Sequence, residues 1–243
     1  QVGKREITDL TGTLLKHPSG SLIVLKDLSA GAHGGKVTGR AEFRLTDPLE
    51  YGLSLTVAGA DLDALFNAGV TDPKKRADVK GALDGTLQLK GTVGKSATRQ
   101  AVGVLRISRG KLYKLPILLG FLHVMYLSVP GDSAFTDGFI SYHLRDDVLM
   151  FREIHLTGSA LSIVGSGSMD MKTEKLRLNF LTGPPGKMPR LDQIADEFLT
   201  GLAREIVEIR VTGTLSKPQT RTVSLRGFDE AIRRLLSPPP PEP

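Results

Sequence analysis

Residues 101–127 read AVGVLRISRGKLYKLPILLGFLHVMYL, and residues 134–181 read AFTDGFISYHLRDDVLMFREIHLTGSALSIVGSGSMDMKTEKLRLNFL. This pattern predicts a strand, a short apolar helix, and then four strands joined by tight turns. Residues 146–147 (DD) and 169–174 (MDMKTE) each fall between two strand-like runs, where acidic and small residues are typical of hairpin turns. The stretch therefore predicts a mainly β fold.

The helix predicted at Leu115–Leu127 is apolar nearly all round, so it has to be covered. Pro116 suits a first helical turn, where its missing N–H costs nothing. The segment is shorter than the roughly 20 apolar residues that span a bilayer. We expect it to lie on the sheet as part of the core; a helix that dips into a membrane surface is the alternative.

The chain has 243 residues, of which 40% are hydrophobic and 5% aromatic, with 27 Gly, 14 Pro and no Trp. Many glycines and few aromatic residues favour strands and turns over a helical bundle. No Cys is present, which excludes disulfides and thiolate metal sites. The net charge of +6 is compatible with anionic lipid or nucleic acid, but the basic residues are scattered, and residues 74–76 (KKR) form the longest basic run.

Alternating strands fill the first third of the chain and recur later. In residues 51–60, Leu53, Leu55 and Val57 share one face while Ser54 and Thr56 share the other. Such alternation predicts an antiparallel sheet with one apolar face and one wet face. We expect strands of this kind at residues 7–15, 21–30, 34–45, 51–60, 80–93 and 207–215.

Three amphipathic helices are expected besides the apolar one, at residues 62–68, 191–202 and 228–236. Asp61 is the expected N-cap of the first helix. The predicted fold class is α+β and mainly β: a long, curved antiparallel sheet of a dozen or so strands, forming an open β-groove, with short helices covering its concave face. We expect one domain over residues 1–236 and a Pro-rich tail or linker over residues 237–243.

The apolar positions of these strands are the candidate groove or core residues. They are Leu53, Leu55, Val57, Leu83, Leu87, Leu89, Leu105, Ile107, Ile163, Leu176, Leu178, Val207 and Ile209. If helices leave part of this face open, the exposed apolar trough implies a lipid or protein partner. If they cover all of it, the same residues form an ordinary core, and the pattern leaves both readings open.

Sequence motifs for catalysis are missing. The segment at residues 94–96 (GKS) resembles the end of a phosphate-binding loop, but a strand follows it instead of a helix, so we expect a hairpin turn. Ser166 and Ser168 lie outside the G-x-S-x-G frame of a nucleophile elbow. The five His residues have no metal-ligand spacing. We therefore expect no catalytic residues, no metal, no cofactor and no nucleic-acid partner.

Residues 102–180 resemble the C-terminal domain of the AsmA family of bacterial envelope proteins. The resemblance rests on GVLRISRGKLYKLPILLGFLHVMYL, a strand and turn followed by an apolar helix with Pro. It rests also on FTDGFISYHLRDDVLMFREIHLTGSALSIVGSGSMDMKTEKLRLNFL, in which an acidic turn and a G-x-G-x-hydrophobic-D motif separate strands. The strands before this block and the helices after it fit the pattern more loosely.

The resemblance implies a domain on the periplasmic side of the inner membrane, held by an N-terminal membrane anchor that this chain does not contain. It implies a non-enzymatic role in binding or guiding phospholipid between membranes and in outer-membrane assembly. The expected partners are phospholipid acyl chains or a membrane, together with other envelope proteins. The alternative is a structural scaffold that offers an open sheet edge to a partner strand in the periplasm.

Overall fold

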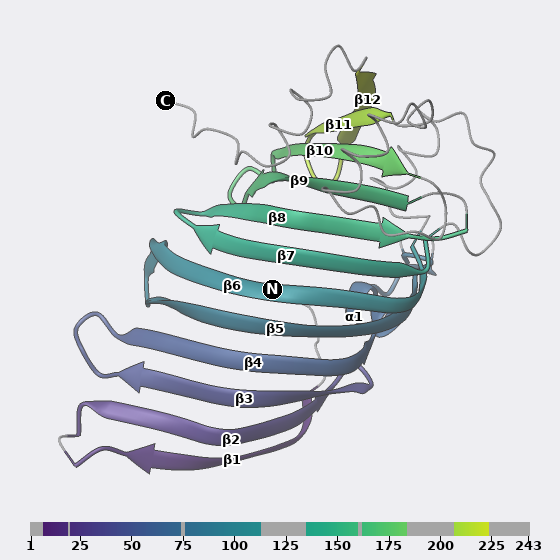
Figure 1. Cartoon of the computed structure of the whole chain (residues 1–243). Helices are drawn as coiled ribbons and strands as arrows, with labels where there is room; N and C mark the ends of the chain where they lie inside the picture. The colour runs from purple at the N-terminus through teal and green to yellow at the C-terminus, as the bar shows by residue number, and fades with distance from the viewer. Residues whose placement is uncertain are drawn as a thin grey trace.

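The computed structural model describes residues 7–18, 20–73, 76–112, 135–159, 162–183 and 207–223 (Figure 1). These residues form one antiparallel sheet of twelve strands, in which each strand pairs with the next along the chain. The strands are β1 (Ile7–Lys16), β2 (Leu22–Ala32), β3 (Gly35–Arg44), β4 (Glu50–Asp61), β5 (Lys80–Thr92), β6 (Lys95–Lys111), β7 (Asp137–Arg145), β8 (Val148–Thr157), β9 (Ser162–Asp170), β10 (Leu176–Gly183), β11 (Glu208–Gly213) and β12 (Pro218–Val223). The predicted mainly β, antiparallel sheet is confirmed.

The described residues contain one α-helix, α1 (Leu62–Phe66). It begins at the predicted cap, where the Asp61 side chain accepts a hydrogen bond from the Ala64 N–H at 2.8 Å. It ends two residues before the predicted end. The other expected helices, at residues 115–127, 191–202 and 228–236, lie outside the described residues, so the set of helices covering the concave face is not confirmed.

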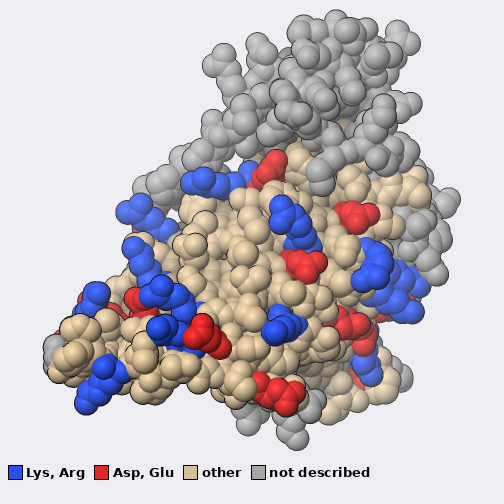
Figure 2. Space-filling model, turned by 60° about the horizontal axis from the view of Figure 1, so that its bottom comes forward, with Lys and Arg blue, Asp and Glu red and all other residues tan. Residues whose placement is uncertain are grey.

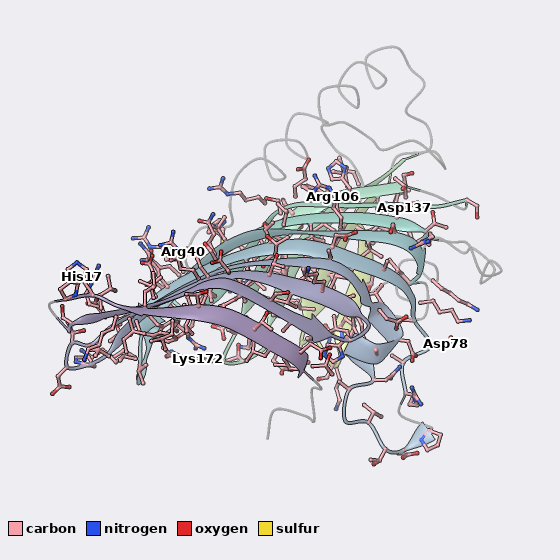
Figure 3. The ribbon with its side chains drawn as sticks, turned by 90° about the horizontal axis from the view of Figure 1, so that it is seen from below. His17, Arg40, Asp78, Arg106, Asp137 and Lys172 are labelled. Atoms are coloured by element: carbon pink, nitrogen blue, oxygen red, sulfur yellow. The ribbon has the colours of Figure 1, made fainter. Side chains whose placement is uncertain are left out.

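The sheet is arched along its strands. Seen from the β1 edge, Arg40 and Arg106 project from the convex side, and α1 lies on the concave side (Figure 3). The apolar side chains face the same side as α1, since Leu62 of α1 belongs to the core against which Leu83 and Ile107 pack. We call this concave side the apolar face.

Strand register places the apolar residues in rows that cross the sheet from strand to strand. Directly opposed partners have side chains close enough to pack against each other. Four rows make up the central and C-terminal part of the apolar face. They are Leu53–Leu89–Ala101–Leu144–Leu149–Met169–Leu176; Leu55–Leu87–Gly103–Tyr142–Phe151–Gly167–Leu178–Val211; Val57–Gly85–Leu105–Ile140–Ile154–Gly165–Phe180–Ile209; and Ala60–Leu83–Ile107–Gly138–Leu156–Ile163–Thr182.

Glycines within these rows make room for a large side chain on the neighbouring strand. Tyr142 lies over Gly103, and its hydroxyl donates a hydrogen bond to the Thr86 carbonyl at 3.3 Å. A β-carbon added at Gly103 would lie 2.6 Å from the Tyr142 hydroxyl oxygen. Gly85 lies under Leu105 in the same way, and Gly165 under Phe180. These glycines therefore allow close side-chain packing across the sheet.

Burial divides the rows into two parts. The large apolar side chains of β2–β6 are half-buried on the apolar face. Those of β9–β11 are buried, and Ile163 and Ile209 have no exposed surface at all. The opposite face of β9–β11 is buried in part: Val164 and Leu181 are each 1% exposed, whereas Arg177 and Thr212 are exposed. We call these parts the open region (β2–β6) and the closed region (β9–β11).

An ionic cluster at one end of the sheet connects three successive hairpin turns. Asp147, between β7 and β8, is 3% exposed and binds the Arg99 guanidinium and the Lys172 ammonium group, each at 2.9 Å. The Ser96 hydroxyl donates a hydrogen bond to Asp147 Oδ2 at 3.1 Å, the same oxygen that contacts Lys172. Arg99 and Ser96 belong to the β5–β6 hairpin, and Lys172 to the β9–β10 turn. The cluster thus joins the open region to the closed region.

Candidate functional site

Twelve of the thirteen candidate residues lie on the apolar face, in the four rows defined above. The thirteenth, Val207, comes one residue before β11 and packs against the core. Its carbonyl accepts a hydrogen bond from the Thr182 N–H at 3.1 Å, which anchors the start of β11 to β10. The sequence alternation therefore assigned these side chains to one face of the sheet.

The candidates separate into two groups by burial. Ile163, Leu176, Leu178 and Ile209 belong to the closed region, where between 0% and 4% of each residue is exposed. These four side chains pack inside the protein and have almost no surface left for a ligand. The half-buried group belongs to the open region: Leu53, Leu55, Val57, Leu83, Leu87, Leu89, Leu105 and Ile107.

Within the half-buried group, Leu83 and Ile107 pack against the core. The other six form a block on β4, β5 and β6 that is the centre of the open surface. Adjacent strands lie about 4.8 Å apart, so the five strands of the open region span about 19 Å from first to last. No charged residue interrupts the four rows on β4, β5 and β6.

The sequence reasoning missed the continuation of this surface onto β1 and β2. Leu14 opposes Leu25, which opposes Ala41 and then Leu53 across β3 and β4. Leu14 is 64% exposed and Leu10 69% exposed. The sequence signal for this continuation is the alternation of Leu10, Gly12 and Leu14 with Thr11 and Thr13.

β1 is an edge strand of the sheet, and all ten of its residues are exposed. An edge strand leaves one row of backbone N–H and C=O groups without a partner strand. Among the described residues, the open region therefore ends at a strand that is apolar on the concave side and has no strand paired along its outer edge.

The polar candidates that the sequence analysis rejected stay apart in the structure. Residues 94–96 lie at the hairpin between β5 and β6, as predicted. Ser166 and Ser168 lie within β9, and both are buried. His143 opposes Met150 while His155 opposes Phe139, so the two histidines are not cross-strand partners.

Among the described residues, no group of three or more His, Asp or Glu side chains is arranged to hold a metal ion. In the same part of the chain, no helix combines the length and hydropathy that crossing a membrane requires.

No protein-family model, curated protein or solved structure matches this chain. The resemblance to the AsmA family stays a prediction from the residues quoted above.

Proposed function

We propose that this chain is a lipid-binding domain of an AsmA-like envelope protein, which holds phospholipid acyl chains on the open region of its apolar face. The observation that carries the proposal is the continuous block of half-exposed Leu and Val side chains on β4, β5 and β6. A continuous apolar surface that is exposed to solvent favours a partner that covers it and removes it from water.

The dimensions of the open region suit an acyl chain. A bilayer leaflet has a hydrocarbon layer about 15 Å thick, half of the whole core, and the rows across β2–β6 extend about 19 Å. Each methylene removed from water contributes about 0.8 kcal/mol. Ten buried methylenes would contribute about 8 kcal/mol, from which the cost of ordering the acyl chain is subtracted.

The wider role follows from the resemblance. We place the domain on the periplasmic side of the inner membrane, tethered by an N-terminal anchor outside this chain. There it binds or guides phospholipid between membranes and supports outer-membrane assembly, in contact with other envelope proteins. The chemistry is passive, since apolar contact needs neither a catalytic residue nor a cofactor.

Native mass spectrometry of the purified chain, with lipid extraction alongside, tests the proposal. We expect phospholipid to copurify with the wild-type chain and to be lost from the double variant Leu55→Asp and Leu87→Asp. Each aspartate would put an unpaired charge against the acyl chain, and burying such a charge is strongly unfavourable. Circular dichroism would establish that the variant stays folded.

The matched control places the same charges on the opposite face of the same two strands. Thr56 and Thr86 are exposed neighbours of Leu55 and Leu87. The double variant Thr56→Asp and Thr86→Asp should therefore retain lipid. A folded wild-type chain that carries no lipid, and takes none from vesicles, would refute the proposal.

A periplasmic scaffold is the second candidate, and the exposed edge of β1 favours it. In that role the chain would add a partner strand to β1 through backbone hydrogen bonds. In the β1–β2 register His17 bonds to Leu22, so the N–H of Lys16 points away from β2, toward the outer edge. Replacing Lys16 with Pro would interfere with such pairing, because Pro has no N–H to donate to a partner strand. Partner capture that is lost in Lys16→Pro, together with absence of lipid, would support the scaffold.

A further inference from the structure

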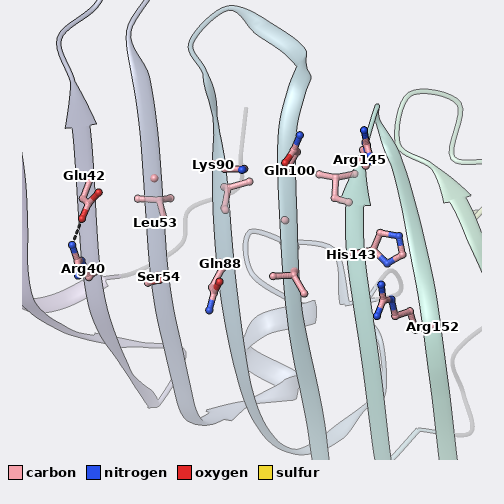
Figure 4. A pocket seen from close by; sticks show the side chains of 15 residues that line it. Arg40, Glu42, Leu53, Ser54, Gln88, Lys90, Gln100, His143, Arg145 and Arg152 are labelled. Atoms are coloured by element: carbon pink, nitrogen blue, oxygen red, sulfur yellow. Dashed lines mark hydrogen bonds and ion pairs between the residues drawn. The ribbon is translucent and has the colours of Figure 1, made fainter.

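A polar hollow of about 700 Å³ lies on the convex face, opposite the apolar rows. It crosses the strands from β3 to β8, close to their hairpin ends (Figure 4). A twisted sheet is saddle-shaped, so the face that is convex along the strands is hollowed across them. The proposed lipid surface and this hollow therefore use opposite sides of the same strands.

Basic side chains converge at the β5–β8 end of the hollow. Lys90 opposes Gln100, and the register of Ala101 with Leu144 puts Gln100 next to Arg145. Lys90 and Arg145 are two strands apart, about 10 Å between backbones, so their long side chains can reach a common ligand.

A β-bulge adds Arg152 to this group. Tyr142 opposes Phe151 and Ser141 opposes Glu153, which leaves Arg152 as the extra residue of β8. Bulges redirect side chains and recur beside functional sites. Here the bulge leaves Arg152 lining the hollow, close to His143 (Figure 4).

Acidic side chains do not neutralise this group. The hollow is lined by four Lys or Arg side chains and by one acidic side chain, Glu42, which is paired with Arg40 at the other end. Within the part of the chain that the structure describes, Lys90 and Arg152 have no ion pair. Arg145 contacts Asp146 at 3.6 Å, but three-quarters of each side chain is exposed, so this pair is weak.

His143 lines the hollow beside Arg152 (Figure 4). Its Nδ1 atom is inaccessible to water and has no hydrogen-bond partner. Burial lowers the pKa of this imidazole, and the nearby charge of Arg152 lowers it further. Lys and Arg side chains also gather toward the left of this side of the molecule in the space-filling view (Figure 2).

We propose that the hollow is a binding site for a phosphate-bearing anion, held by Lys90, Arg145 and Arg152. Arginine suits phosphate because its planar fork donates two parallel hydrogen bonds, while lysine contributes a point charge. The amide groups of Gln88 and Gln100 supply neutral donors at the same place. The hollow has room for more than the phosphate group itself. The phosphate can therefore belong to a soluble compound or to a lipid headgroup.

Isothermal titration of the chain with pyrophosphate tests this site. We expect saturable binding that weakens by about tenfold or more in Arg152→Gln and in Lys90→Gln, because each variant removes a charge-assisted hydrogen bond. Arg152→Lys should recover part of the affinity. The control is Arg106→Gln, which removes a positive charge from the same face. The Arg106 guanidinium carbon lies 5.2 Å from the centre of the Phe139 ring, outside the hollow. Removing the charge of Arg106 should therefore leave pyrophosphate binding unchanged.

Flotation with vesicles of phosphatidylglycerol in phosphatidylcholine identifies the source of the phosphate. Pyrophosphate binding without vesicle binding would assign a soluble anion. Vesicle binding that Arg152→Gln abolishes would assign a headgroup. Absence of saturable binding to both, or an equal loss in Arg106→Gln, would overturn the site. The double variant Leu55→Asp and Leu87→Asp should bind pyrophosphate normally, which separates this proposal from the lipid groove.

Discussion

The open and closed regions use the same strand pairing but differ in what their faces contact. In the open region, Leu55 and Leu87 are half-buried neighbours on one face, and exposed Thr56 and Thr86 lie on the other. In the closed region the apolar face is buried, and so are Val164 and Leu181 on the opposite face. The difference shows that one continuous sheet can leave an apolar face half exposed at one end and bury it in a packed core at the other.

The sequences of the two regions differ accordingly. β5 alternates Leu with Asp, Thr, Gln and Lys, which is typical of a strand with one wet face. β9 reads SIVGSGSMD, and its convex side carries Ser162, Val164, Ser166 and Ser168, with Asp170 as the one charged residue at its end. On that side Ser162 has no exposed surface and Val164 is 1% exposed.

Matched substitutions in the two regions should produce the largest contrast. Ile163→Asp places an unpaired charge where no surface is exposed, so we expect a loss of more than about 4 kcal/mol in the free energy of unfolding. Leu87→Asp, on the half-exposed face, should cost about 1 kcal/mol. Urea denaturation measures both. Similar losses would mean that the open region is covered in solution, which would remove the basis for the lipid proposal.

Local chemistry explains what could be predicted from the sequence. The alternation of β4 and β5, the Asp61 cap and the acidic turn at residues 146–147 depend on residues near one another in the chain. All of them agree with the structure. The face assignment of twelve candidate residues followed from the same alternation, because side chains on a strand alternate strictly between faces.

Long-range packing explains what could not be predicted. Leu87 and Leu178 have the same alternating context, yet Leu178 is 4% exposed and Leu87 is half-buried. Alternation gives the face of a residue but not whether another segment covers that face. The basic hollow was missed for a related reason. Lys90, Arg145 and Arg152 meet only through the register of four strands and the bulge in β8.

The border between the two regions can be tested at Gly103, which packs under Tyr142. Gly103→Val would force Tyr142 off its site and press against backbone, so we expect a loss of about 2–3 kcal/mol in the free energy of unfolding. The control is Gly52→Val on β4. A β-carbon at Gly52 meets nothing within 4 Å, and valine is a good strand former, so stability should stay the same or rise. Equal losses would show that the Tyr142 contact is unimportant.

The smallest of the three effects is expected at Asp147, whose ionic cluster joins the two regions. Asp147→Asn keeps the shape of the side chain and tolerates the positive φ of 59° at this position, so it removes mainly the charge. Hydrogen bonds from Lys172, Ser96 and Arg99 hold the pKa of the Asp147 carboxyl below its usual range, with the Lys172 bond the largest cause. We therefore expect a partial loss of stability at pH 7, measured as a lower thermal midpoint.

The pH dependence gives this prediction its sign. A lowered carboxyl pKa stabilises the fold fully above the unfolded value of about 3.9, and the stabilisation disappears as the pH falls through the folded value. The midpoints of the wild type and Asp147→Asn should therefore converge below about pH 4. The same ion pair raises the pKa of Lys172. The stabilisation from Lys172 is therefore present below about pH 10.4 and is lost as the pH rises through the pKa of Lys172 in the folded protein.

Asp146→Asn is the matched control, since Asp146 is three-quarters exposed and pairs weakly with Arg145. A gap between Asp147→Asn and wild type that stays constant with pH would mean that the charge of Asp147 does not hold the three turns together.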